Sequence, residues 1–113
     1  MPAYVHQGSS LSGEIILTVD GDRVIEGSSL WGTQILTIDG SNVRNGSGCW
    51  GGIVAHVDGK YVRKGGTSFG EIVAVVDGEY VRDGTSSWGE IIATVEDGGR
   101  MAAAAAAVYL LMI

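Results

Sequence analysis

Residues 71–83, EIVAVVDGEYVRD, contain two short runs rich in Val, Ile and Tyr, separated by Asp77-Gly78. These residue types favour strands, and Asp-Gly between two such runs is a strong hairpin signal. We therefore predict a β-hairpin with Asp77 and Gly78 as the central residues of a type I′ turn. A turn of this kind would pair Val76 with Glu79, Val75 with Tyr80, and Ala74 with Val81.

The predicted register gives the hairpin one apolar face and one mixed face, because side chains alternate along a strand. The apolar face is expected to point into the core and carries Ile72, Ala74, Val76 and Val81. The mixed face is expected to be half exposed, and it is our candidate for an interface with other proteins. Its residues are Val73, Val75, Tyr80 and Arg82, with Tyr61 and Arg63 one repeat earlier.

This hairpin is one copy of a 19-residue repeat. Glycines stand at 13, 32, 51, 70 and 89 and again at 8, 27, 46, 65 and 84, while Asp-Gly recurs at 20–21, 39–40 and 58–59. The consensus is x-V-x-x-G-S-S-x-W-G-x-I-I-x-x-V-D-G, and the last copy ends in VEDGG, as expected where a repeat array is capped. The units are predicted at 4–21, 23–40, 42–59, 61–78 and 80–98, within one domain segment of residues 1–98.

The chain ends in RMAAAAAAVYLLMI (100–113), which is its best helix-forming segment. A helix that is apolar on all sides is buried. One position of the repeat becomes small toward the C-terminus, as Leu17, Leu36, Ala55, Ala74 and Ala93. We therefore expect residues 99–113 to pack against the aliphatic face of the hairpins, within the same domain. Docking into a neighbouring copy and lying at a membrane surface are the alternatives for this segment.

These features predict an all-β fold: a five-unit β-hairpin array of pseudo-fivefold character, closed or nearly closed, with one C-terminal Ala-rich helix in or against the core. About ten short strands could close a ring and remove the exposed sheet edges. The period, the consensus and the Ala-rich C-terminus resemble bacterial short-repeat β-hairpin proteins of the β-flower kind, in which hairpin petals surround a central axis. The resemblance implies a pseudo-symmetric all-β fold, and it implies no activity.

Composition narrows the possible partners. The chain has 113 residues, a formal net charge of −6 and a pI of about 4.6, which disfavours binding to nucleic acid. The apolar run at 101–113 is shorter than the roughly 20 residues that an integral membrane span needs. The start of the chain lacks the pattern of a secretory signal, and the lone Cys49 fits a reducing compartment, so we expect a cytoplasmic location.

One position of the repeat is aromatic in four units and is followed by glycine: Trp31, Trp50, Phe69 and Trp88, with Ser12 in the first unit. We favour a structural interpretation, in which each ring covers its loop and packs on the next hairpin. The alternative interpretation is ligand binding, because an exposed aromatic beside Ser or Thr suits a sugar. Phe69 supports the structural interpretation, since it lacks the indole N–H.

No residue pattern predicts catalysis, a metal or a cofactor. His6 and His56 lack further ligands at zinc spacing, and the Asp-Gly pairs are explained by turn chemistry. Paired serines such as Ser86-Ser87 have no candidate base nearby in the sequence. Arginines at 44, 63 and 82 are expected to form cross-strand ion pairs with glutamates at 14, 71 and 90.

The sequence therefore predicts a non-enzymatic structural or protein-interaction module that self-assembles or binds another protein. The alternative is a carbohydrate-binding module that uses the repeated Trp-Gly loops. The two differ in the aromatic side chains, which are buried in the first and exposed to solvent in the second.

Overall fold

The computed structural model describes residues 2–48, 50–67, 69–86, 88–97 and 99–112. Cys49, Ser87 and Gly98, which the sequence predictions named, lie outside the described residues. The described chain forms ten strands followed by one helix, with the following bounds: β1 (Ala3–Gln7), β2 (Ile15–Asp20), β3 (Arg23–Glu26), β4 (Gln34–Asp39), β5 (Asn42–Asn45), β6 (Ile53–Asp58), β7 (Tyr61–Lys64), β8 (Ile72–Asp77), β9 (Tyr80–Asp83), β10 (Ile91–Glu96) and α1 (Arg100–Leu111).

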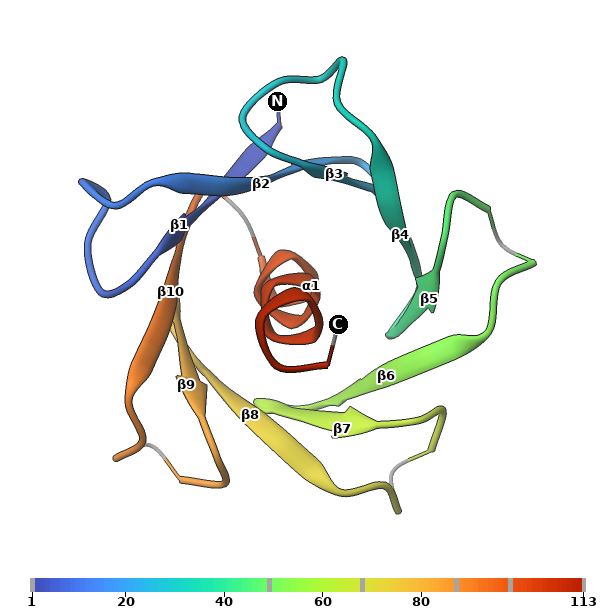
Figure 1. Cartoon of the computed structure of the whole chain (residues 1–113). Coiled ribbons are helices and arrows are strands. Elements are labelled where there is room, and N and C mark those ends of the chain that lie inside the picture. Colours follow the sequence, from blue (N-terminus) through green and yellow to red (C-terminus); the bar gives the residue numbers. More distant parts are fainter. Residues whose placement is uncertain (1, 49, 68, 87, 98, 113) are drawn as a thin grey trace.

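The ten strands form a closed antiparallel barrel in which each strand pairs with its neighbours in sequence and β1 pairs with β10. The molecule is a flat disc of 35 × 34 × 21 Å, and longer loops extend outward from the ring (Figure 1). The prediction of an all-β closed ring with a C-terminal helix is therefore confirmed.

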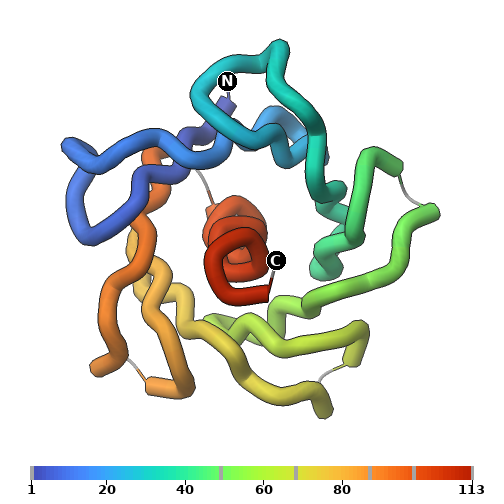
Figure 2. Tube along the Cα trace, in the orientation of Figure 1, coloured from blue at the N-terminus to red at the C-terminus, as the bar shows by residue number. Residues whose placement is uncertain are grey.

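Helix α1 occupies the centre of the barrel (Figure 2). Its six alanines, 102–107, are all buried, so strands surround the helix on every side. The helix contacts β6, β8, β9 and β10 more extensively than the strands of the N-terminal half. This side carries Ala55, Ala74 and Ala93 in the core, where the N-terminal half has Leu17 and Leu36. Small residues thus let the helix approach one side of the barrel closely.

The short turns correct the predicted hairpin register. Asp77 pairs with Tyr80 and Val76 pairs with Val81, so the two turn residues are Gly78 and Glu79. Gly78 has a φ of 62°, and no positive φ is found at Glu79. Glycine at the first central position, with positive φ there alone, is the pattern of a type II′ turn rather than type I′. The partner strand is shifted by two residues, so each side chain keeps the face that the prediction gave it.

A β-bulge overrides that alternation at the start of β8. The pairing shifts between Val62 and Arg63, which face Ala74 and Ile72, and Val73 is the extra residue. Bulges re-aim side chains locally. Val73 consequently packs against the core cluster, whereas Ile72, predicted in the core, is half-buried and outside that cluster. The same shift occurs at the other long-loop connections.

The glycine before each long-strand segment is required by close backbone approach. A Cβ added at Gly51 would overlap the carbonyl oxygen of Asn45, and the same clash arises at 13, 32, 70 and 89. In each case the overlapping atom is a backbone oxygen at the end of the preceding strand. Any side chain at these positions would therefore push the loop away from the barrel.

Replacing Gly51 with alanine is expected to lower the free energy of unfolding by about 1–3 kcal/mol, as for other overpacked sites. The adjacent Gly52 is the matched control, because a Cβ there meets nothing within 4 Å. Gly52→Ala is expected to be neutral or slightly stabilising. Urea denaturation of both variants tests this, and equal destabilisation by the two substitutions would contradict it.

The ring is closed by the two ends of the sheet. Strand β1 pairs with β10 through Tyr4–Glu96 and Val5–Val95, in the same register as the β8–β9 hairpin. The N-terminal strand thus takes the place that the second strand of a hairpin has elsewhere. Asp97, with a φ of 58°, occupies the position that Gly78 has in the β8–β9 turn, and the chain then enters the barrel as α1.

Candidate functional site

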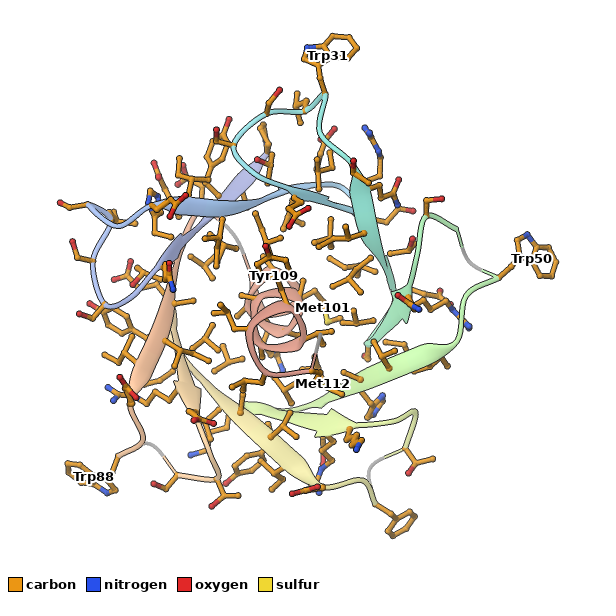
Figure 3. The ribbon with its side chains drawn as sticks, in the orientation of Figure 1. Trp31, Trp50, Trp88, Met101, Tyr109 and Met112 are labelled. Atoms are coloured by element: carbon orange, nitrogen blue, oxygen red, sulfur yellow. The ribbon has the colours of Figure 1, made fainter. Side chains whose placement is uncertain are left out.

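The four aromatic side chains of the repeat stand at the tips of the outer loops and point away from the ring, as Figure 3 shows for the three tryptophans. Trp31, Trp50, Phe69 and Trp88 are 94–99% exposed. The prediction that these rings cover their loops and pack on the next hairpin is therefore wrong. No strand or helix covers these rings, since nearly all of their surface is exposed. We call these four side chains the aromatic tips.

Three of the four tips are held by a hydroxyl two residues before them, and the fourth, Trp50, has Gly48 at that position. The backbone N–H of Trp31 donates to Ser29 Oγ at 3.1 Å, and that of Phe69 donates to Thr67 Oγ1 at 3.2 Å. Trp88 and Ser86 repeat this contact at 3.2 Å. These hydroxyls therefore act as turn residues, as expected for the loop serines. In the first outer loop the backbone N–H of Ser12 donates to Ser10 Oγ at 2.9 Å, so this loop has the same turn without an aromatic tip.

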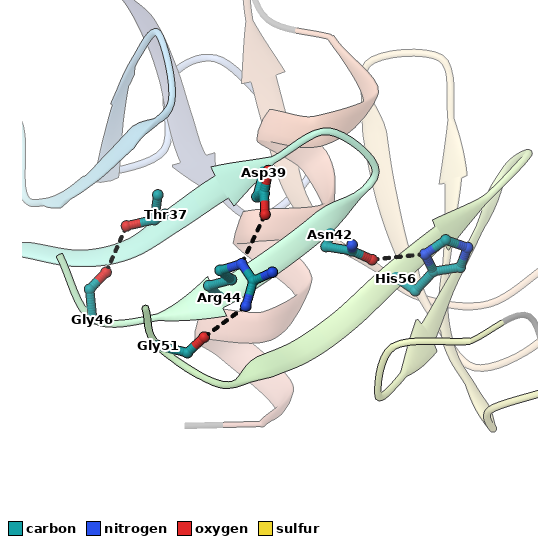
Figure 4. A network of polar contacts seen from close by, with 7 residues as sticks. All are labelled: Thr37, Asp39, Asn42, Arg44, Gly46, Gly51 and His56. Carbon is teal, nitrogen blue, oxygen red and sulfur yellow. Dashed lines mark hydrogen bonds and ion pairs between the residues drawn. The ribbon is translucent and has the colours of Figure 1, made fainter. Parts of the chain in front are cut away.

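An arginine links the base of three outer loops to the barrel (Figure 4). Arg44 Nε donates to Asp39 Oδ2 at 2.8 Å, and its Nη1 donates to the carbonyl of Gly51 at 2.9 Å. Arg63 and Arg82 make the equivalent contacts with Asp58 and Gly70 and with Asp77 and Gly89. We call each such arrangement an arginine clasp. The glycine that it holds directly follows an aromatic tip, so the clasp fixes where the ring projects.

The clasp corrects the predicted ion pairs. The arginines pair with the aspartates of the Asp-Gly turns and not with Glu14, Glu71 or Glu90. The turn shift described above explains the change, because it places Asp77 opposite Tyr80 and diagonally beside Arg82. These aspartates therefore serve both the turn and the clasp.

At two places the residue in the clasp position is not arginine. In the unit that carries Trp31, the residue at this position is Ile25, and it is fully buried. His6 takes this position at the ring closure, where its Nδ1 contacts the Gly13 carbonyl and its Nε2 contacts Glu96 Oε1, both at 2.8 Å. The hydrogen bond to the Gly13 carbonyl, followed by that to Glu96, raises the pKa of His6 above its ordinary value. His6 is thus a titratable substitute for a permanently charged residue.

Another repeat position, which the sequence analysis did not single out, also ties the loops to the barrel. Thr18, Thr37 and Thr94 are buried and donate from Oγ1 to the carbonyls of Gly27, Gly46 and Gly8, each at 2.8 Å. Their 19-residue spacing would have revealed them. In the two remaining units the position is held by His56, whose Nδ1 contacts Asn42 Oδ1 at 2.9 Å, and by the fully buried Val75.

The candidate protein interface is partly covered in the single chain. Val75 is fully buried, and Val73 packs against the core. Tyr61, Tyr80, Arg63 and Arg82 are half-buried, with both arginines engaged in clasps. Lys60 and Arg63 lie 5.6 and 5.9 Å from the ring centre of Tyr61, within cation–π range. The surface available to a partner on this face is therefore mainly tyrosine and arginine.

A cavity of about 490 Å³ lies where α1 enters the barrel, and no residue pattern predicted it. Its wall includes Val19, Ile38 and Val57 from the strands and Met101 and Ala102 from the helix. The helix leans toward the opposite side of the ring, which leaves this space on the N-terminal half. No group of three potential metal ligands occurs among the described residues. No helix in the described part of the chain is long and apolar enough to cross a bilayer.

A family model described as "6-fold beta flower protein" matches residues 5–110, which covers nearly the whole chain. No curated protein matches the chain, and no solved structure does. A β-flower fold is consistent with the closed all-β barrel, and the family match brings no catalytic or binding residues with it.

Proposed function

The chain belongs to the 6-fold beta flower family, and from that premise we propose that it is a non-enzymatic, multivalent carbohydrate-binding module that acts through its aromatic tips. In this proposal the ten strands are five hairpin units of pseudo-fivefold arrangement, and the outer loops of four units each offer one aromatic tip to a ligand. The supporting observation is the 94–99% exposure of Trp31, Trp50, Phe69 and Trp88.

The setting of each ring favours a sugar over a protein partner. Every tip is one aromatic ring followed by a glycine, with Ser, Thr or Gly two residues before it. The tips point to different sides of the disc, as Figure 3 shows for the tryptophans. A protein interface needs about 800 Å² per partner with an apolar centre, which one ring does not supply. A ring and a neighbouring hydroxyl do match one sugar unit, whose C–H face packs on the ring and whose hydroxyls form hydrogen bonds.

The radial arrangement favours a repetitive ligand. Tips that point outward from a disc in different directions cannot all contact one flat surface, such as a membrane. They can engage several segments of a polymer, and such multivalency raises avidity by about 10²–10⁴ over a single site. The net charge of −6 favours a neutral polysaccharide over an acidic one.

Binding to the neutral polysaccharides cellulose, chitin, xylan and mannan tests this proposal, with alginate as an acidic comparison. Replacing all four tips with alanine is expected to lower avidity by about 10²-fold or more. Ser12→Trp is expected to raise it, because the first loop already has the turn that holds a tip. The absence of binding to every neutral polymer, or unchanged avidity in the fourfold variant, would refute the proposal. Unchanged thermal stability of the variants excludes unfolding as a cause.

Self-assembly is the second candidate function, and the C-terminal end of the barrel is what favours it. Leu111 is 38% exposed, and Leu110 and Met112 are only partly buried. Apolar surface at one end of a disc suits stacking of copies. Light scattering after size exclusion tests this: an oligomer that Leu111→Glu converts to an 11.7 kDa monomer would support assembly. A monomer at all concentrations would exclude it.

A further inference from the structure

Four strand pairs of the barrel are joined by two-residue turns, but the equivalent β10–β1 pair has no covalent link at that point. This pair therefore depends on side chains as well as on the strand ladder. At the clasp position of this pair, His6 contacts Glu96 and the Gly13 carbonyl. Three other units have an arginine at this position. We call β1 and its contacts with β10 and β2 the seam.

The contacts of His6 fit only the imidazolium form. Nδ1 faces a backbone carbonyl, which can only accept a hydrogen bond, and Nε2 faces a carboxylate. Neutral imidazole has one N–H, so it satisfies one acceptor and turns a lone pair toward the other. His6 is only 5% exposed, so water cannot readily replace the lost contact. Neutral histidine consequently weakens the link between β1, β10 and the first outer loop.

The charged surroundings of His6 are simple. On β10 the charged group is Glu96, 2.8 Å from Nε2, and the residue paired with His6 is the uncharged Thr94. On the β2 side the contacts are the Gly13 carbonyl and the paired Ile15. The charged residue of that segment is Glu14, which directly precedes β2. Within β1 the remaining titratable side chain is Tyr4.

We propose that the seam is a proton-controlled closure, in which charged His6 holds β1 in the ring and neutral His6 releases it. Release of β1 breaks the barrel at its one non-covalent hairpin position and uncovers the edges of β10 and β2. Unpaired edges can accept another strand, including β1 of a second copy. The two ends of the sheet thus become a site of strand exchange when the pH rises.

The direction follows from linkage. The Gly13 carbonyl and then Glu96 raise the pKa of His6 in the closed state above its ordinary value of 6.5. The stabilisation is fully present below 6.5 and is lost as the pH rises through the raised pKa. One proton is involved, so the opening constant of the seam rises by at most about tenfold per pH unit in this window. Below and above the window it is constant.

Native-state hydrogen exchange of the β1 amides at pH 6 and pH 8.5, corrected for intrinsic rates, tests this closure. The opening constant of β1 is expected to be larger at the higher pH. The opening constant of β6, which lies across the barrel from β1 (Figure 1), is expected to change little. His6→Arg restores the clasp residue of the other units and is expected to remove the dependence. His56→Gln, which alters the other histidine, is expected to keep it.

Equal β1 opening constants at both pH values, or the same pH dependence in His6→Arg, would overturn the proposal. If His6→Arg fails to fold, a proton NMR titration of His6 in the His56→Gln chain decides the matter. A pKa at or below 6.5 for His6 would then show that the closed seam does not prefer the imidazolium form, and a raised pKa would support it.

Discussion

Replacing Ala105 with leucine is expected to lower the free energy of unfolding by about 3 kcal/mol or more, at the upper end of overpacking effects. Ala105 lies in the middle of α1 and is fully buried. The barrel is closed around it, so strands cannot separate to make room without breaking a ladder. Thermal unfolding followed by far-UV circular dichroism measures the loss. Tryptophan emission is a poor probe here, because all three indoles are exposed in the folded chain.

Ala102→Leu is the matched control for this substitution. Ala102 is on the same helix, but it lines the cavity of about 490 Å³ at the entrance of the barrel. The added atoms have space there, and the change in stability is expected to stay within about 0.5 kcal/mol. Equal destabilisation by the two leucines would show that the cost comes from the helix itself and not from the tightness of the ring.

Removal of residues 100–113 is expected to abolish cooperative folding altogether. The helix covers the inward side chains of the barrel, including Leu17, Leu36 and Val62. An empty barrel would leave a large apolar void, which a closed ring of fixed strand number cannot collapse to fill. Loss of a cooperative thermal transition and of amide dispersion in NMR spectra is the expected outcome.

A shorter truncation distinguishes the effect of removing the buried helix from the effect of removing only the chain end. A chain ending at Leu110 loses Leu111, which is 38% exposed, and Met112, which is half-buried. It keeps every buried alanine. This variant is expected to unfold cooperatively, with a modest fall in the midpoint. A full truncation that retained a cooperative transition at the native midpoint would refute the central role of the helix.

The barrel and its helix could be predicted from the sequence because their signals are periodic. A 19-residue repeat of strand-forming runs, followed by six alanines, leaves few arrangements that bury the helix and satisfy every strand edge. The turn register could not be assigned as well, since Asp77-Gly78 fits either a type I′ turn centred on both residues or a type II′ turn starting at the glycine. The bulge at Val73 likewise depends on pairing geometry that the alternating pattern does not reveal.

The aromatic tips show where general rules about residue types mislead. Large aromatic side chains are usually buried, and that rule gave the wrong placement for Trp31, Trp50, Phe69 and Trp88. The arginine clasps were missed for a different reason: the partner carbonyls of Gly51, Gly70 and Gly89 belong to the backbone and have no signature in the sequence. The clasps are visible only in the folded structure, where each arginine lies within hydrogen-bonding distance of its glycine carbonyl.

The alanine helix also limits how such a chain can evolve. Repeat arrays commonly gain and lose units by duplication, and an open array tolerates this because each unit touches only its neighbours. Here the closed ring of ten strands surrounds one shared helix, and the diameter of a barrel grows with its strand number. A twelve-stranded descendant would enclose a wider space, and its helix would need leucines or phenylalanines where this chain has Ala102–Ala107. Unit number and helix thickness must therefore change together across generations.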